Sequence, residues 1–457
     1  MGNGRITLRQ AAQWCGGTVA PEFAEIAFSG ANFDTRRLRE GELFVAIVGA
    51  RDGHDFVADA MQKGAAAVLA SKKLDPAIPA IYADDTVKAL QDVARHWRET
   101  LRIKAVGVTG SVGKTTTKGM IAAVLNTAFV TQRTEENFNN GIGLPVTILN
   151  MDERCEAAVL EMGMNHFGEL SLLTRIAQPD IAVITNVGTM HIENLGSREG
   201  ILLAKLEILE GLRPNGVAIF NGDNDLLSAV AARHHALTFG LSRQNDVYAE
   251  EIRTSEDKTE FIAVGFGKRI PINLPVVGEH NVVNALAAVT VGLCCDLTPE
   301  QIREGLLHFQ NHGMRQRMYD LGSVHIIEDC YNAGPESMRA SLKVLARAEG
   351  RRIAVLGGML ELGSFAPQEH YLVGRETAKA ANLLFAYGEH SEQYVRGALE
   401  EGMRYARKFD THEALAAALQ AELLPGDTVL FKGSRGMKME RVLQSLDTRE
   451  LGGEENG

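Results

Sequence analysis

Short apolar runs separated by polar turns open the chain and predict a small α/β segment over residues 1–83. Runs 43–48 and 65–70 are short, apolar and bounded by turn residues, as buried strands are. The polar triplet 84–86 then precedes a stretch with helical apolar spacing, which is typical of a helix N-cap. We interpret this helix as the start of a second segment.

Residues 84–313 alternate short apolar runs with longer stretches of helical spacing. Such alternation is typical of a doubly wound sheet of parallel strands. Residues 237–275 instead contain short strand-like runs with turn signals, which indicates an antiparallel addition. The buried strands predicted in this segment are 103–108, 157–162, 181–186 and 217–221.

The same alternation continues from residue 314 to residue 457, with strands predicted at 353–356, 383–387 and 428–432. A single hydrophobic core rarely serves a chain of this length. The sequence therefore predicts an α/β protein of three domains, 1–83, 84–313 and 314–457, in which the central domain carries the doubly wound parallel sheet.

Composition, charge and cysteine usage narrow the class of protein. Of 457 residues, 45% are hydrophobic and 23% charged, which excludes wholesale disorder and the fibrous classes. The longest apolar run, 285–295, is too short to span a bilayer, and residues 1–30 show no secretory pattern. We therefore expect a cytoplasmic enzyme without membrane insertion.

The net charge of −11 gives no general attraction for nucleic acid. Anionic ligands would need local cations and backbone N–H groups. The five cysteines are scattered without zinc spacing, as expected for reduced thiols. Nothing in the sequence demands an assembly, and we expect a monomer.

The strongest chemical signal is Thr-Gly-Ser-Val-Gly-Lys-Thr-Thr at 109–116, between a predicted strand and a predicted helix. Gly110 and Gly113 let backbone N–H groups close around a phosphate at a helix N-terminus. Lys114 can reach the terminal phosphates, and the Thr115 hydroxyl can ligate Mg²⁺. Valine replaces the first glycine of the full Walker pattern, but the shorter G-x-x-G-K-T is met in the right context.

Two polar residues are expected at the same edge of the predicted sheet. Glu161 lies near the carboxyl end of a predicted strand, where a carboxylate faces the ligand crevice and can offer an oxygen to Mg²⁺. His191 follows the next predicted strand in a loop. A loop histidine alone is more often a surface residue, but together with the phosphate loop the two form a candidate metal cluster.

Lys205 interrupts an apolar helix face. The predicted helix 197–212 has apolar residues at 201, 202, 208, 209 and 212, and Lys205 falls on this stripe. One interpretation is that its ammonium reaches solvent past its neighbours, and Leu203 and Leu206 weaken the stripe. The other is a buried lysine with a depressed pKa and unusual chemistry.

Two polar, glycine-rich segments also allow two interpretations. In 137–145, Asn139 and Asn140 either bind phosphate or a reacting carboxylate, or simply form turns. The same choice applies to 278–284, which opens an alanine-rich helix.

Five motifs together carry a resemblance to a known family: Thr-Gly-Ser-Val-Gly-Lys-Thr (109–115), Asn-Asn-Gly-Ile-Gly-Leu-Pro (139–145), Glu-Met-Gly (161–163), Gly-Glu-His-Asn-Val-Val-Asn (278–284) and Glu-Asp-Cys-Tyr-Asn-Ala (328–333). Over nearly its full length the chain resembles the Mur ligases, the ATP-dependent amide-bond-forming enzymes of peptidoglycan synthesis. Asp34-Thr-Arg, Tyr331-Asn-Ala and Lys432-Gly-Ser-Arg are most similar to the branch that adds D-alanyl-D-alanine.

The resemblance implies an N-terminal domain that binds a UDP-sugar, a central P-loop domain that binds ATP, and a Rossmann-like C-terminal domain that receives a dipeptide. It implies a ligase that joins D-alanyl-D-alanine to UDP-N-acetylmuramoyl-tripeptide through an acyl phosphate, with ATP and two Mg²⁺ ions. Lys205 would then be carbamylated, which turns an awkward lysine into a carboxylate-like metal ligand.

The roles implied by the resemblance fall into three sets. ATP would be bound by Thr109, Gly110, Ser111, Val112, Gly113, Lys114, Thr115, Thr116, Asn281, Asn284, Arg315 and Asp329. Thr115, Glu161, His191 and Lys205 would hold metal, and Lys114, Lys205, His191 and Arg315 would serve catalysis, with Arg317 the alternative to Arg315. Substrates would be met by Asp34, Thr35, Arg36, Asn139, Asn140, Tyr331, Asn332, Lys432, Ser434 and Arg435.

The chain departs from the family pattern at Gly334, usually asparagine, and at Gly358, usually aspartate. The second departure removes an acidic side chain that could orient the incoming amine. The alternatives are a diaminopimelate- or lysine-adding Mur ligase, a folylpolyglutamate synthase, or a P-loop switch ATPase. The switch ATPase is disfavoured because a guanine-reading Asn-Lys-x-Asp is absent.

Overall fold

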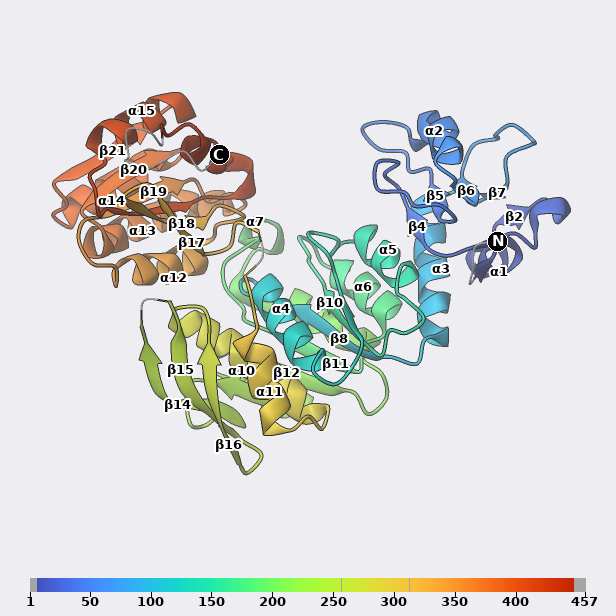
Figure 1. Cartoon of the computed structure of the whole chain (residues 1–457), viewed down its shortest axis with the longest axis horizontal. Helices are drawn as coiled ribbons and strands as arrows, with labels where there is room; N and C mark the ends of the chain where they lie inside the picture. Colours follow the sequence, from blue (N-terminus) through green and yellow to red (C-terminus); the bar gives the residue numbers. More distant parts are fainter. Residues whose placement is uncertain (1–5, 256, 312, 448–457) are drawn as a thin grey trace.

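The computed structural model describes residues 6–447 except 256 and 312, and this part of the chain folds around four β-sheets (Figure 1). The N-terminal sheet has the strand order β2-β7-β6-β5-β4, and a two-stranded sheet pairs β1 with β3. The predicted strands at 43–48 and 65–70 are confirmed as β5 and β6. The elements here are β1 (Ile6–Thr7), α1 (Leu8–Cys15), β2 (Thr18–Val19), β3 (Ala27–Phe28), β4 (Ala31–Asn32), β5 (Leu43–Val45), α2 (Val57–Gln62), β6 (Ala67–Ala70) and β7 (Ala80–Tyr82).

The helix α3 (Thr86–Thr100) connects this sheet to the central one. Its N-cap is Asp85, whose side chain accepts hydrogen bonds from the N–H groups of Val87 and Lys88, as the sequence predicts. The helix packs against α1 on one side and against α5 and α6 on the other. It therefore belongs to the cores of both segments.

The central sheet has nine strands in the order β16-β15-β14-β13-β12-β11-β8-β10-β9. All neighbours from β9 to β14 are parallel, whereas β14, β15 and β16 are antiparallel. The doubly wound sheet and the antiparallel addition are thus confirmed, and the addition extends the same sheet. The strands are β8 (Lys104–Thr109), β9 (Thr131–Arg133), β10 (Ala157–Glu161), β11 (Ile181–Ile184), β12 (Val217–Asn221), β13 (Leu237–Gly240), β14 (Val247–Thr254), β15 (Thr259–Gly265) and β16 (Lys268–Leu274).

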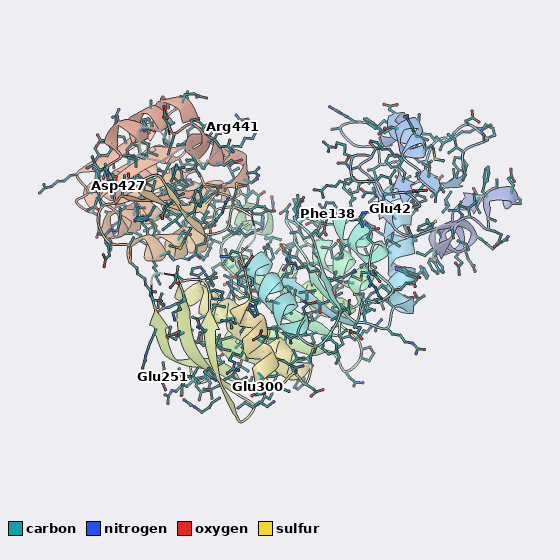
Figure 2. The ribbon with its side chains drawn as sticks, viewed as in Figure 1. Glu42, Phe138, Glu251, Glu300, Asp427 and Arg441 are labelled. Atoms are coloured by element: carbon teal, nitrogen blue, oxygen red, sulfur yellow. The ribbon has the colours of Figure 1, made fainter. Side chains whose placement is uncertain are left out.

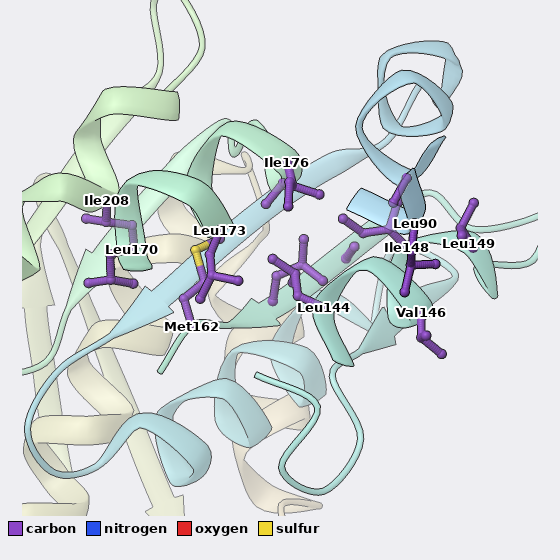
Figure 3. Close-up of a cluster of buried hydrophobic side chains, with 14 of the residues drawn as sticks. Leu90, Leu144, Val146, Ile148, Leu149, Met162, Leu170, Leu173, Ile176 and Ile208 are labelled. Atoms are coloured by element: carbon purple, nitrogen blue, oxygen red, sulfur yellow. The ribbon is translucent and has the colours of Figure 1, made fainter. Parts of the chain in front are cut away.

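Helices cover both faces of this sheet, as Figure 1 shows. Alternate strand residues enter two separate cores, so Leu160 and Ile184 face one side while Val159 and Val183 face the other. Figure 3 shows part of the first core, where Leu90 of α3 gathers with residues of α5 and α6. The helices are α4 (Lys114–Leu125), α5 (Gly143–Leu149), α6 (Glu169–Ala177), α7 (Ile192–Leu195), α8 (Arg198–Leu206), α9 (Asp225–Ala231), α10 (Glu279–Cys294) and α11 (Pro299–Leu307).

The C-terminal sheet has six strands in the order β17-β18-β22-β19-β20-β21, parallel except for the β17–β18 pair. Each sheet lies within one of the three predicted segments, while the boundaries at 83/84 and 313/314 stay predictions. The elements are β17 (Arg317–Leu321), β18 (Val324–Asp329), α12 (Pro335–Leu345), β19 (Arg352–Gly357), α13 (Ala366–Ala380), β20 (Leu383–Tyr387), α14 (Ser391–Glu400), β21 (Tyr405–Phe409), α15 (His412–Glu422), β22 (Thr428–Lys432) and α16 (Glu440–Gln444).

The order of the central strands decides where ligands can bind. β8 lies between β10 and β11. The next two strands along the chain, β9 and β10, lie on one side of β8, and the strands from β11 onward lie on its other side. The carboxyl end of a strand at such a switch point opens into a crevice. Among the described helices, none is long and apolar enough to cross a membrane.

Arg98 fastens α3 to the central domain. Its side chain is 0% exposed, and its guanidinium donates to the carbonyls of Ala177 at 2.8 Å, Gln178 at 3.0 Å and Leu101 at 3.2 Å. Two of these carbonyls lie at the C-terminal end of α6, where helical partners are missing. Burial lowers the pKa of Arg98 to about 10, so the guanidinium stays charged at neutral pH.

We expect Arg98→Ala to lower the free energy of unfolding by about 3 kcal/mol, because it leaves several buried carbonyls without donors. Urea unfolding followed by circular dichroism measures the change. Arg95→Ala is the matched control on the same helix, since Arg95 pairs with Glu99 at the surface and should cost under about 1 kcal/mol. Equal losses for the two variants would contradict the assignment.

Candidate active site

The connection between β8 and α4 has the form of a phosphate-binding loop. β8 ends at Thr109 and α4 begins at Lys114, as the motif predicts. Gly113 has a φ of 83°, and a Cβ there would lie 2.7 Å from Oδ1 of Asn284. Backbone and space therefore both require glycine, and the first N–H groups of α4 can face a phosphate.

The loop after β11 holds the phosphate loop in place. The N–H of Val112 donates to Oδ1 of Asn186 at 2.9 Å, and the Thr185 hydroxyl donates to the carbonyl of Val112 at 2.6 Å. The N–H of Gly188 donates to the Ser111 hydroxyl at 3.0 Å. The conformation of the phosphate loop is thus fixed before any ligand arrives.

Lys114 is folded back against its own loop. Its Nζ donates to the carbonyls of Gly110 at 2.6 Å and Ser111 at 3.3 Å. Burial lowers the pKa of Lys114, and the charge of Arg315 lowers it further, while Glu161 opposes them. A bound phosphate would give this half-buried ammonium an anionic partner.

Glu161 is a buried carboxylate with a full set of partners. It is 2% exposed. Its Oε2 accepts from the Thr115 hydroxyl at 2.9 Å and lies 3.1 Å from Nζ of Lys118, and its Oε1 accepts from Nδ2 of Asn139 at 3.0 Å. Burial raises its pKa, but the surrounding cations lower it overall, so the group is ionised.

These groups line a first cavity of about 830 Å³, enclosed by the central domain and the C-terminal domain. The phosphate loop and α10 form one wall, and β18, α12 and Lys432 form the other. The predicted site residues on its wall are Ser111, Val112, Gly113, Lys114, Thr115, Thr116, Asn139, Asn140, Glu161, His191, Asn281, Asn284, Arg315, Asp329, Tyr331, Asn332 and Lys432.

His191 lies on the wall of this cavity, whereas Lys205 is buried in α8. His191 has a φ of 64°, and its Nδ1 lies 2.5 Å from Oε2 of Glu361 in the C-terminal domain. Lys205 is 1% exposed while Leu203 is 61% exposed, so the stripe is real and the ammonium does not reach solvent. Burial, and then the charge of Lys114, lowers the pKa of Lys205 well below its usual value.

Polar side chains from α10 and the C-terminal domain form a network at the far end of the first cavity. Nδ2 of Asn281 donates to the carbonyl of Val277 at 2.8 Å and to Oε1 of Gln316 at 3.1 Å. Nε2 of His280 lies 2.9 Å from the same oxygen. Oδ1 of Asn284 instead accepts from the Thr117 hydroxyl at 3.1 Å. The amide groups are therefore already oriented by the protein.

The C-terminal wall is organised by Asp329. Its Oδ2 lies 2.6 Å from Nζ of Lys432, which is 2% exposed, and accepts from the Ser341 hydroxyl at 2.7 Å. Asp329 and Lys432, expected to meet different substrates, are thus partners. Arg315 stacks on the ring of Tyr331 at 3.9 Å and lines the cavity.

Arg317, the alternative to Arg315, is directed elsewhere. It stacks on Tyr319 at 4.8 Å and lies 3.8 Å from Glu328, with a side chain that is 65% exposed. The structure therefore places Arg315 at the cavity.

A second cavity of about 990 Å³ lies beside the first and reaches the N-terminal domain. Glu42 of that domain and Phe138 of the central domain both line it, and Figure 2 shows them close together. Thr115, Thr116, Arg315 and Tyr331 line both cavities. The two cavities therefore meet at the phosphate loop.

Several predicted substrate residues lie on neither wall. Both carboxylate oxygens of Asp34 accept hydrogen bonds from the Arg36 guanidinium. The Thr35 side chain instead lies by Asp59, where its hydrogen bond lowers the pKa of that carboxyl group. Ser434 joins the carbonyl of Ala333 to the N–H of Leu360, and exposed Arg435 pairs with Glu440. Their substrate roles stay predictions. The segment 34–36 is nevertheless flanked by Asn32 and Arg37, which do line the second cavity.

Among the cavity-lining residues that sequence reasoning missed are Lys118, Gln316 and Arg37. Lys118 follows Lys114 by one helical turn, a signal that could have found it. Gln316 stands next to the predicted Arg315, but its φ of 48° and its contacts with α10 appear only in the structure. Arg37 follows Arg36 directly and pairs with Glu136 of the central domain at 2.8 Å.

The residues present fit Mg²⁺ held jointly with a nucleotide. Thr115 and Glu161 offer hard oxygen ligands beside the phosphate loop, and Lys118 already places a cation on the same carboxylate oxygen. Across residues 6–447 apart from 256 and 312, no cluster of three His, Cys, Asp or Glu side chains could hold a metal by itself. Mg²⁺ usually completes its shell with phosphates and water, which agrees with this arrangement.

Comparison with known proteins identifies the family. A family model described as "Mur ligase middle domain" matches residues 108–292, and one described as "Mur ligase, glutamate ligase domain" matches residues 314–435. The chain belongs to the Mur ligase family. The alternative of a P-loop switch ATPase is therefore wrong.

Three relatives that are at least 31% identical to this Mur ligase cover nearly its full length. UDP-N-acetylmuramoyl-tripeptide–D-alanyl-D-alanine ligase of Bacillus subtilis is 41% identical over 96% of this chain and 98% of that protein. MurF from Acinetobacter baumannii has a TM-score of 0.88 at 32% identity, covering 96% and 98% of the two chains. MurF from Thermotoga maritima, solved in complex with ADP, has a TM-score of 0.81 at 31% identity, covering 92% and 97%.

We expect Gly113→Ala to weaken nucleotide binding by this Mur ligase about 5- to 150-fold. The new methyl group must displace Asn284 and strain the loop, at a cost of about 1–3 kcal/mol. Calorimetric titration with Mg·ADP measures it. Gly196→Ala is the control, because Gly196 also has a positive φ (79°) but nothing lies within 4 Å of its Cβ position. A similar loss of nucleotide affinity in both variants would contradict the prediction, because it would show that strain at any positive-φ glycine weakens binding.

Proposed function

We propose that this Mur ligase joins D-alanyl-D-alanine to UDP-N-acetylmuramoyl-tripeptide at the expense of ATP. The observation that carries the proposal is the near-complete coverage of relatives of that name at up to 41% identity. The geometry supports it, because the first cavity, which is lined by the phosphate loop, meets the second cavity, which extends to the N-terminal domain. Such an arrangement suits two large substrates that must react with each other.

The chemistry explains why three substrates meet here. An oxygen of the peptide carboxylate attacks the γ-phosphorus of ATP, ADP leaves, and an acyl phosphate forms. The amine nitrogen of the dipeptide then attacks the acyl carbon, and inorganic phosphate leaves as the amide forms and the nitrogen loses a proton. Phosphorylation is needed because a free carboxylate has no adequate leaving group.

In this scheme, side chains of the protein offset the repulsion between the phosphates of ATP and the peptide carboxylate. Lys114 moves from the loop carbonyls to the phosphates, and Arg315, at the meeting point of the two cavities, faces the γ-phosphate and the attacking carboxylate. Asn281, Asn284 and Asp329 hold the nucleoside, and Lys432 is positioned by Asp329.

Mg²⁺, when bound, supplies positive charge that offsets the phosphates. We infer that Thr115 and Glu161 hold one ion, and that His191 and carbamylated Lys205 hold a second. The depressed pKa of Lys205 supports this assignment, because carbamate forms only from the neutral amine. We further infer that the enzyme works as a monomer in the cytoplasm, since both cavities are formed within one chain and the five cysteines are free.

Mass spectrometry of a reaction with ATP, UDP-N-acetylmuramoyl-tripeptide and D-alanyl-D-alanine tests the proposal. The expected product is the UDP-linked pentapeptide, with one ADP and one phosphate released. Tripeptides ending in diaminopimelate or lysine should be compared side by side. Product formed only from a single amino acid and a shorter acceptor would contradict the proposal.

Lys114→Ala should lower turnover about 10²–10⁴-fold, because it removes a cation from the phosphate whose charge changes in the transition state. Phosphate release in the presence of all three substrates measures the rate. Lys343→Ala, an exposed lysine on α12, is the control and should turn over normally. Near-parental turnover of a folded Lys114→Ala enzyme would remove this lysine from the mechanism.

Lys205→Ala should abolish turnover while the protein stays folded, because the proposed carbamate ligand is lost. Added acetate should restore part of the activity by filling the vacated ligand position, and the parent should depend on bicarbonate. Leu203→Ala, on the exposed side of the same helix, serves as control. Intact-mass analysis under CO₂ should find 44 Da of added mass on the parent, and activity of Lys205→Ala close to the parent would refute the carbamate.

A further inference from the structure

Lys118 is a buried cation that the scheme above does not use. It lies one turn after Lys114 on α4 and is 4% exposed. Its Nζ lies 3.1 Å from Oε2 of Glu161. A buried ammonium is costly without an anionic partner, so its partner at each stage of the reaction matters.

The pair formed by Lys118 and Glu161 lies in the wall between the two cavities. Glu161 lines the first cavity and Lys118 lines the second. Lysine has a long flexible stem with an ammonium that can change partners. A rotation of this side chain can therefore take Nζ from the carboxylate into the second cavity.

Positive charge exceeds negative charge around this wall. Glu161 is surrounded by Lys118, Lys114 and Arg315, and Arg133 adds its charge to the surroundings of Lys118. Arg133 also lines the second cavity. The excess charge attracts an anion into the second cavity at this end.

A divalent cation bound by Thr115 and Glu161 would compete with Lys118 for the same oxygen. Oε2 of Glu161 is the atom that both the Thr115 hydroxyl and the Lys118 ammonium contact. Coulomb attraction grows with the product of the charges, so the carboxylate prefers the divalent ion. Lys118 then loses its partner and is repelled by the ion beside it.

We propose that Lys118 binds the reacting carboxylate of the peptide acceptor after Mg²⁺ has displaced it from Glu161. This inference rests on the proposed function. The ammonium then offsets the repulsion between that carboxylate and the γ-phosphate of ATP. Until the metal ion binds, Lys118 stays paired with Glu161. Strong binding of the acceptor therefore requires that Mg²⁺ and ATP bind first.

Paired changes in protein and ligand test the contact. The protein variants are Lys118→Met and, as control, Lys88→Gln, which likewise removes a cation from a carboxylate (Asp92) but at the surface. The ligands are UDP-N-acetylmuramoyl-tripeptide and its analogue with the terminal carboxyl amidated. Calorimetry with Mg²⁺ and a non-hydrolysable ATP analogue gives the dissociation constants.

In the parent and in Lys88→Gln, amidation should weaken binding about 10–100-fold, the effect of losing a charged hydrogen bond. In Lys118→Met the acid should bind more weakly by a similar factor, and acid and amide should differ by less than about threefold. A full amidation penalty in Lys118→Met would overturn the inference.

The affinity for a metal nucleotide gives a second readout. The inference predicts an unchanged or higher affinity in Lys118→Met, whereas damage to the fold would lower it. Without acceptor, Lys118→Met should bind Mn²⁺·ADP as tightly as the parent or more tightly, because the competing ammonium is gone. Weaker metal binding would overturn the displacement of Lys118 from Glu161 by the metal ion. If Lys118→Met fails to fold, Lys118→Gln replaces it. A parent enzyme that binds no UDP-tripeptide at all would instead refute the proposed function.

Discussion

A buried carboxylate that must stay charged is the constraint on which this site depends. Glu161 ends β10, which lies between β8 and the edge strand β9 of the largest sheet. Burial there favours the neutral acid, and the cations around Glu161 lower its pKa again. Its partners Thr115, Asn139 and Lys118 come from α4 and from the loop before α5. They converge because β10 lies directly beside β8 in the sheet. The ionised carboxylate can attract a metal ion, and the cations around it can attract an anion.

The loop after β11 transmits this arrangement to the C-terminal domain. On one side, Gly188 is bonded to the hydroxyl of Ser111 in the phosphate loop. On the other, the N–H of Thr189 donates to Oε1 of Glu336 at 3.0 Å, and His191 meets Glu361. Both glutamates belong to the C-terminal domain, so hydrogen bonds and an ion pair connect the phosphate loop, the candidate metal ligand His191 and the C-terminal domain.

The departures from the family pattern have different physical settings. At Gly334 a Cβ would lie 2.7 Å from Cγ of Met190, so the methionine occupies the space that a larger residue would need. At Gly358 the nearest atoms to a Cβ lie 3.5 Å away or further, and a side chain would fit. Nothing in the structure explains the loss of an acidic group there.

Sequence patterning by itself determined the α/β class, the parallel central sheet, the cap of α3 and the phosphate loop. These are local or periodic properties, because apolar spacing, caps and glycine positions are set by neighbours along the chain. Only the tertiary structure decided that Arg315 rather than Arg317 reaches the cavity, that Asp329 holds Lys432, and that Lys118 joins Glu161. The paired residues are up to 103 positions apart in the chain. Strand order and domain packing bring them together, and neither leaves a periodic pattern in the sequence.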